Sequence, residues 1–192
     1  MKNLITKIAI VAIAFVAFSC SSPDEEKSLK PVSILEIAKA TPEMSSFVEA
    51  VEAAGLTSTL DSPGDYTVFM PNNDAFASVL GGISAADYEI ANPGVLAKVL
   101  KFHVLSSRAL STDLTDGMDV TTLEGQSFKI GISVPDPLLP NDNVISINAV
   151  DPFDTNDPPA SITSTIIARD VKCSNGIVHP VDTILLPLSI LN

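Results

Sequence analysis

The chain has little positive charge and little cysteine. Its 192 residues contain 11 Lys and Arg against 23 Asp and Glu, together with two Cys and two His. The formal charge of −12 repels the phosphates of nucleic acids, so no nucleic-acid partner is expected. The same charge opposes electrostatic docking on anionic lipids, so attachment to a membrane would require a covalent anchor. Apolar residues make up 46% of the chain, which is enough to build a packed core.

The sequence also lacks the common catalytic and cofactor-binding motifs. It contains no G-x-S-x-G, H-E-x-x-H, P-loop or dinucleotide-binding glycine pattern. His103 and His179, the only imidazoles, lie in apolar segments, where an internal hydrogen bond is their ordinary role. The acidic segment 151–157 lacks the turn glycine and terminal Glu of an EF-hand loop. We therefore expect no catalytic residues, no cofactor and no metal site; a hydrolase with an unrecognised site is the distant alternative.

The N-terminus has the pattern of a cleavable signal peptide. Two lysines precede the apolar run 8–18, which is shorter than the ~20 residues that cross a bilayer as a helix. Ser19-Cys20 follows this run and resembles a bacterial lipobox, in which Cys20 becomes the lipidated first residue. Ala17 stands where lipoboxes usually have Leu, so plain secretion after Ser19 is the alternative. We predict a signal peptide of the lipoprotein type over residues 1–19 and lipidation at Cys20.

The segment after the cysteine is polar. Residues 20–31 have no apolar periodicity, which predicts a flexible acidic tether. Ser21 resembles an outer-membrane sorting signal, and the acidic residues 24–26 resemble an export signal of some surface lipoproteins. A merely polar linker is the alternative. We therefore expect an outer-membrane lipoprotein of a bacterial cell envelope, attached by its lipid and exposed on the cell surface.

The second cysteine, Cys173, has no intrachain partner if Cys20 is acylated. It closes the partly apolar segment 166–172. A small buried hydrophobic side chain is the usual role of such a residue, and we expect that role here rather than a catalytic thiol.

Helical patterns occupy the first half of the remaining chain and strand patterns the second. The spacing of apolar residues predicts helices over 33–40, from a capped start at Thr41 to Gly55, over 73–80 after Asn72, after Ser84, and from Asn92. Tyr66–Met70 reads as a short strand, and alternating patterns predict strands at 127–134, 145–147, 162–168 and 177–181. Segment 135–160 reads as proline-rich loops around one strand. This order predicts an α+β domain over residues 32–192.

Three segments in this order and spacing resemble the FAS1 (fasciclin) domain. They are Tyr66–Phe76, like the first box of the family; Leu100–Leu105, like its Tyr-His box; and Asp170–Pro187, like its second box. The box positions that we take as structural or binding residues are Thr67, Phe69, Pro71, Asn72, Phe76, Phe102, His103, Asn175, Gly176, His179 and Asp182. Phe102 stands in the usual place of Tyr, so a phenolic hydroxyl that could reach a partner is absent.

The resemblance implies a wedge of β-strands with helices packed along one side. It also implies extracellular adhesion or ligand binding, and a protein that is not an enzyme. The leading hypothesis is therefore an envelope-anchored adhesion or ligand-binding module whose partner is an extracellular polysaccharide or protein. The alternative is an accessory lipoprotein that docks on another envelope protein, for instance in a nutrient-uptake assembly.

Overall fold

Helices precede strands along most of the chain, in the order that the sequence patterns predict. A computed structural model describes residues 32–133, 144–150 and 161–191. The predicted signal peptide, Cys20 and the predicted tether lie outside the described residues, as does the acidic segment 151–157. The proline-rich segment 135–160 is described only at 144–150, where the predicted strand is confirmed.

The helices lie almost entirely in the first half of the described chain. The α-helices are α1 (Ile34–Ala40), α2 (Ser45–Ala53), α3 (Thr57–Asp61), α4 (Asn73–Leu80), α5 (Ala85–Ala91) and α6 (Val95–Phe102). Two 3-10 helices accompany them, η1 (Pro42–Met44) and η2 (Leu188–Leu191). The helix that was expected from Asn92 begins at Val95, because Gly94 has a left-handed φ of 81° and ends the preceding turn.

Local side-chain caps start three of these helices. The Ser33 hydroxyl accepts from the N–H of Glu36 at 3.2 Å, and the Glu36 carboxylate accepts from the N–H of Ser33 at 2.8 Å, a complete capping box. Asn72 accepts from the N–H of Ala75 at 2.9 Å, and Ser84 opens α5 in the same way. The starts of α4 and α5 are therefore confirmed as the sequence predicts.

Thr41 stands at the N-cap of η1 with Pro42 in the first turn, as predicted, but the predicted capping bond of its hydroxyl is wrong. Its hydroxyl donates backward to the carbonyl oxygen of Ile37 at 2.8 Å and so closes α1. A threonine can satisfy its hydroxyl on the carbonyl four residues earlier as easily as it can cap the next helix. The chain then continues through η1, and α2 begins only at Ser45.

The strands form two sheets. The first has the order β2-β1-β8-β7, from strands β1 (Tyr66–Pro71), β2 (Val104–Leu105), β7 (Val171–Cys173) and β8 (Gly176–Val181). The second has the order β3-β4-β5-β6, from strands β3 (Asp119–Thr121), β4 (Ser127–Ser133), β5 (Val144–Val150) and β6 (Ser161–Thr165). All described neighbours pair antiparallel except β1 and β8, which are parallel. The strand expected over 162–168 ends at Thr165, and Ile166 makes an isolated bridge to Val181.

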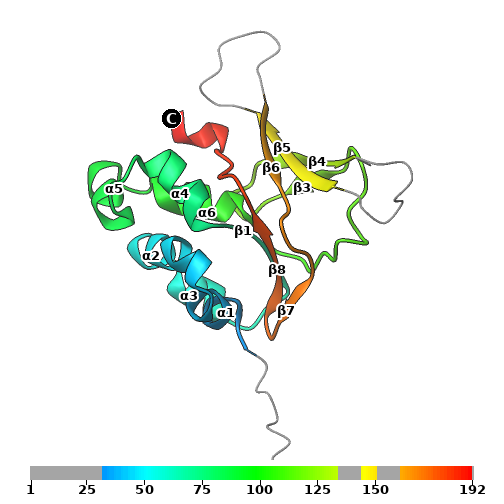
Figure 1. The fold of residues 1–192 in the computed structure, drawn as a ribbon, viewed down its shortest axis with the longest axis horizontal. Helices are drawn as coiled ribbons and strands as arrows, with labels where there is room; N and C mark the ends of the chain where they lie inside the picture. Colours follow the sequence, from blue (N-terminus) through cyan, green and yellow to red (C-terminus); the bar gives the residue numbers. More distant parts are fainter. Residues whose placement is uncertain (1–31, 134–143, 151–160, 192) are drawn as a thin grey trace, which may run out of the picture. The chain divides into compact units, whose positions relative to one another are not determined.

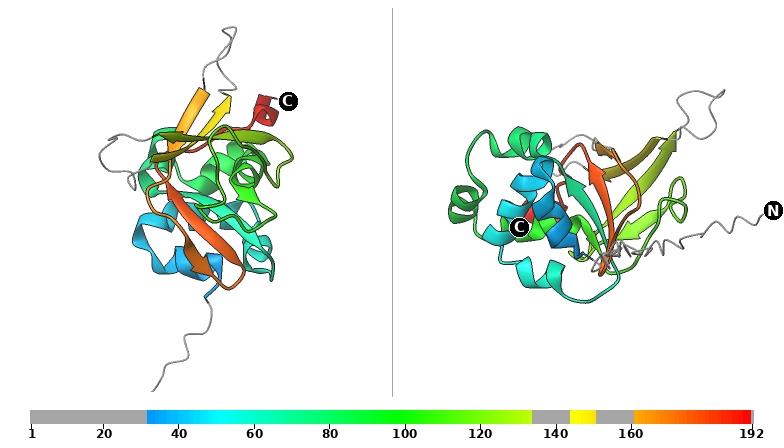
Figure 2. Two further views of the ribbon diagram at one scale, coloured as in Figure 1. Left: turned by 90° about the vertical axis from the view of Figure 1, so that its right-hand side faces the viewer. Right: turned by 60° about the horizontal axis from the view of Figure 1, so that its bottom comes forward.

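Strand β1 contributes to two cores, one on each face of the first sheet. Val68 and Met70 point into a core shared with the helices, whereas Phe69 points into a core shared with the second sheet. Figure 1 and Figure 2 accordingly show the helices on one side of β1 and β8 and the second sheet on the other. A strand that is covered on both faces needs apolar residues at consecutive positions, which explains the uninterrupted run Val68–Met70. This arrangement is the predicted α+β fold, with helices along one side of the strands.

Candidate functional site

Most of the family-box residues lie inside the domain. The side chains of Thr67, Phe69, Pro71, Phe76, Phe102, His103, Asn175 and His179 are buried, as is Gly176. Asn72 is half-buried and caps α4, whereas Asp182 is exposed and accepts from the N–H of Thr165 at 2.7 Å. The boxes therefore come together around β1 and β8, and they do so as interior contacts rather than as an open site.

Asn175 joins three elements that are far apart in the sequence. Its side-chain oxygen accepts from the N–H of Ile34 at 2.9 Å, at the start of α1. Its side-chain nitrogen donates to the carbonyl oxygens of Leu60 at 2.7 Å and Ser62 at 3.0 Å, at the end of α3. Its own backbone carbonyl accepts from the N–H of Tyr66 at the start of β1. A buried amide that makes all these bonds acts as a structural clamp.

His103 connects the end of α6 to the C-terminal segment. Its Nδ1 lies 2.8 Å from the carbonyl oxygen of Val99, and its Nε2 accepts from the N–H of Leu185 at 3.0 Å. These partners assign the proton to Nδ1, so the ring is a neutral imidazole with one donor and one acceptor in use. Burial lowers the pKa of His103 to about 4, despite the opposing bond to Val99.

His179 holds the segment after β2 against β8. Its Nε2 is 3.1 Å from the carbonyl oxygen of Ala109, and its Nδ1 accepts from the N–H of Asp170 at 3.2 Å. Asp170 in turn accepts from the N–H and the hydroxyl of Ser111. The pKa of His179 is lowered, mainly by burial. The ring stacks on Phe69 at a centroid distance of 5.5 Å.

Ser111, His179 and Asp170 are the three residue types of a Ser-His-Asp catalytic triad and are linked through Asp170. Their hydrogen bonds, however, differ from those of a triad. A general base must offer a free nitrogen to the serine hydroxyl. Both nitrogens of His179 already bond to backbone groups, and the Ser111 hydroxyl donates to the Asp170 carboxylate instead. This cluster therefore gives no support to the hydrolase alternative.

Phe102 occupies the interior rather than a contact surface. Its ring is 2% exposed and meets the ring of Phe128 edge to face, with centroids 5.8 Å apart. A side chain here faces the core between the two sheets, so the position does not present an aromatic ring to an external partner. Cys173 is also buried, as predicted, and burial raises the pKa of its thiol to about 11. A thiol with that pKa is almost wholly protonated at neutral pH and is a poor nucleophile.

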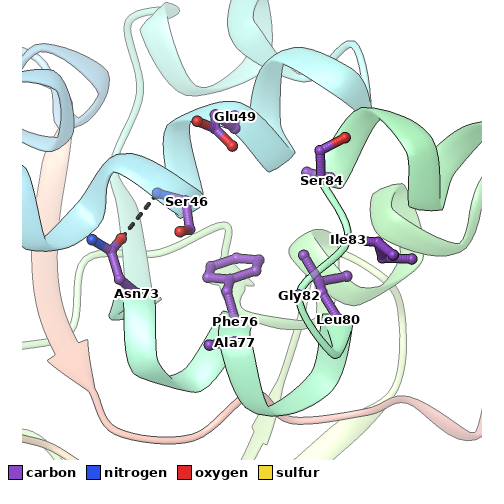
Figure 3. A pocket seen from close by; sticks show the side chains of 10 residues that line it. Ser46, Glu49, Asn73, Phe76, Ala77, Leu80, Gly82, Ile83 and Ser84 are labelled. Carbon is purple, nitrogen blue, oxygen red and sulfur yellow. Dashed lines mark hydrogen bonds between the residues drawn. The ribbon is translucent and has the colours of Figure 1, made fainter.

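One accessible hollow of the helical layer lies between α2, α4 and the start of α5. This α2–α4–α5 pocket has a volume of about 190 Å³ and is lined by Ser46, Glu49, Asn73, Phe76, Ala77, Leu80, Gly82, Ile83, Ser84 and Ala85. Figure 3 shows the Phe76 ring at its centre, with Ser46 and Glu49 on α2 above it. Asn73 fixes one wall, because its side-chain oxygen accepts from the N–H of Ser46 at 3.0 Å. Phe76 is the box residue that lines this pocket.

The sequence reasoning missed the other pocket residues. Ile83 is 50% exposed, although it is a large apolar residue just after Gly81-Gly82. The glycine pair ends α4, since Gly81 has a left-handed φ of 61° at the C-cap of this helix. An apolar residue that directly follows such a helix end was the available sign that this turn exposes an apolar side chain.

No group of three or more potential metal ligands occurs within residues 32–133, 144–150 and 161–191. Over the same ranges, no helix is long and apolar enough to cross a membrane.

Comparisons with known proteins identify the family. The family model described as the Fasciclin domain matches residues 42–187. Protein sll1483 of Synechocystis is 29% identical over 81% of this chain and 74% of its own length. The pig transforming growth factor-beta-induced protein ig-h3 is 26% identical over 81% of this chain, which spans only 19% of that relative. A solved FAS1 domain pair from the insect cell adhesion molecule fasciclin I matches 84% of this chain and about half of its own, 53%, with a TM-score of 0.56 and 17% identity.

Proposed function

This chain belongs to the fasciclin domain family, and from that premise we propose that it is a non-catalytic adhesion or ligand-binding module of a bacterial cell envelope. One solved structure with the same fold comes from the insect cell adhesion molecule fasciclin I. One structural observation carries the proposal: both imidazoles are committed to backbone groups inside the domain, whereas the α2–α4–α5 pocket is open. Such an arrangement suits contact with a macromolecule better than acid–base chemistry.

The proposed ligand is an extracellular polysaccharide or protein. The test uses the soluble chain from residue 28 to residue 192, which contains the compact unit 31–192. We expect this chain to bind components of the medium or of other cells, measured by pull-down from intact cells and on a glycan array. A heat-unfolded sample serves as the control. Capture of no partner in either assay would contradict the proposed function.

A second candidate is an accessory lipoprotein that docks on another envelope protein. Exposed apolar side chains on and beside α4 and α5 favour it, because Val79, Ile83 and Ile90 are 39%, 50% and 78% exposed. The two candidates differ in where the partner resides. Co-purification with proteins of the same envelope would support the accessory role, and a partner on another cell would support adhesion.

The proposed domain organisation is a lipoprotein signal peptide over 1–19, a lipidated Cys20 with an acidic tether over 20–31, and the fasciclin domain over 32–192. The acyl chains of a lipoprotein bury tens of methylenes at about 0.8 kcal/mol each, enough for stable attachment to the outer membrane. We expect Cys20→Ala to release the protein from membranes or to leave it unprocessed, as measured by cell fractionation and palmitate labelling. Wild-type protein that never takes up labelled palmitate would contradict the anchor, and Cys173→Ala, which should remain membrane-bound, is the matched control.

A further inference from the structure

One stretch of the helical layer carries carboxylates and no cations. From residue 40 to residue 97 the sequence has no Lys, Arg or His, and its acids are Glu43, Glu49, Glu52, Asp61, Asp65, Asp74, Asp87 and Glu89. Lys39 and Arg108, which lie outside this stretch, pair with Glu52 and Asp65, each at 3.2 Å. Within the part of the chain that the structure describes, no ion pair or hydrogen bond reaches the exposed carboxylate of Glu49.

Glu49 lies where two hollows meet. One is the α2–α4–α5 pocket, whose apolar walls are Phe76, Leu80 and Ile83. The other has a volume of about 380 Å³ and is lined by Glu49, Glu52, Ala53, Ser84 and Ala86. Both hollows are lined by Glu49 and Ser84, so they adjoin at these two residues, and the two together are called the α2 groove below. This groove is apolar at its Phe76 end and acidic at its Glu52 end.

We propose, on the premise that the protein is a binding module, that the α2 groove receives a lysine or arginine side chain of a protein partner. The aliphatic part of such a side chain lies on Phe76, Leu80 and Ile83, while its charged end meets Glu49. An arginine or lysine combines an apolar stem with a cationic head, and the groove offers an apolar wall beside an unpaired carboxylate. Charge complementarity therefore selects this occupant.

The charge of the groove argues against a second copy of this chain as its occupant. A second copy of this chain would bring another formal charge of −12 against the same carboxylates. Val79 on α4 and Ile90 on α5 are further exposed apolar side chains on helices that contribute to the groove, and they suit apolar residues that flank the inserted cation.

The test is an NMR titration of the soluble chain, residues 28–192, with a synthetic acetylated leucine–arginine–leucine amide at low ionic strength. We expect the largest shifts at Ser46, Glu49, Ile83 and Ser84. Binding should be weakened by about three- to fivefold in Glu49→Gln, because an exposed ion pair contributes up to about fivefold in affinity. The wild-type protein should bind the same peptide with citrulline in place of arginine as weakly as Glu49→Gln binds the arginine peptide. Asp119→Asn, which removes the same unit of charge from the second sheet, should leave binding unchanged.

The apolar half of the groove is tested with a second pair of variants. Ile83→Ser should weaken peptide binding, whereas Ile167→Ser, at a residue that is 56% exposed outside the groove, should not. Shifts centred elsewhere, no shift at any soluble peptide concentration, or equal weakening by Glu49→Gln and Asp119→Asn would each overturn the inference. Shifts of the groove signals on raising the protein concentration without peptide would indicate a second copy as occupant and would also overturn it.

Failure of this inference and failure of the proposed function give different results. If cells or glycans capture the wild type and Glu49→Gln equally, the binding function stands and the groove is not its site. If neither protein is captured while the peptide binds as expected, the groove has the inferred chemistry and the proposed function fails.

Discussion

Replacing Gly176 by Ala is expected to destabilise the domain more than the same substitution at any other glycine whose φ lies outside the left-handed region. An ideal Cβ at Gly176 would lie 2.1 Å from the backbone oxygen of Tyr66 and 2.9 Å from Cδ1 of Ile34. The first of these atoms belongs to β1, which pairs with β8 in parallel at this position. A backbone oxygen cannot rotate away as a side chain can, so the added methyl group must separate the two strands.

The expected cost is therefore at the upper end of the range for overpacking, about 3 kcal/mol or more in the free energy of unfolding. That corresponds to a melting temperature lowered by roughly 10 °C for a domain of this size. Gly81→Ala is the matched control, because Gly81 has open space around its Cβ position but a left-handed φ of 61°. Strain at such a φ costs about 1–2 kcal/mol. Thermal unfolding followed by circular dichroism would contradict this account if Gly176→Ala melted at or above the temperature of Gly81→Ala.

Local interactions account for what the sequence predicted well. The caps at Ser33, Asn72 and Ser84 each join residues three positions apart, so the sequence contains both partners in one short window. The alternation of Phe128 and Ile130 with exposed neighbours reflects a strand covered on one face only. Thr41 shows the limit of such reasoning, because its hydroxyl had two local partners available and bonded to the carbonyl of Ile37.

Long-range contacts could not be predicted from periodicity. The parallel pairing of β1 with β8 joins residues more than a hundred positions apart, and Asn175 bonds to Ile34 across 141 positions. Resemblance to a family located these residues, but only the structure shows that their polar groups bond within the protein. The α2 groove was missed for a related reason. It arises where α2, α4 and α5 meet, and no single helix carries its pattern.

The domain is expected to lose stability between pH 7.5 and pH 5 because of its buried histidines. His103 has a folded-state pKa of about 4, whereas an unfolded histidine titrates near 6.5. The unfolded chain therefore binds a proton first as the pH falls. Neutral His103 contributes its full stabilisation of the fold at pH values above the pKa of the unfolded histidine. This stabilisation declines as the pH falls below that pKa, and it stops changing once the pH is below about 4. The pKa of His179 is lowered too, so it contributes in the same direction.

For His103 alone, this proton uptake by the unfolded chain lowers the free energy of unfolding, relative to pH 7.5, by about 2 kcal/mol at pH 5 and by about 3 kcal/mol below pH 4. The measurement is urea unfolding of the wild type and His103→Ala at pH 7.5 and pH 5. At pH 7.5 the variant should be less stable by about 1–3 kcal/mol, because the N–H of Leu185 loses its buried acceptor. It should then lose about 2 kcal/mol less than the wild type on acidification. His179 remains in both proteins, so the difference between their slopes isolates His103.

Equal pH slopes for the two proteins would show that His103 is not the titrating group. A binding measurement on the same variant separates a structural role from a functional one. If His103 acts only through the bonds to Val99 and Leu185, any loss of binding should follow the unfolded fraction and disappear under conditions where the variant is fully folded. A variant that stays folded and yet loses its ligand would place His103 in the binding site, and the interior role assigned to the Leu100–Leu105 box would then be wrong.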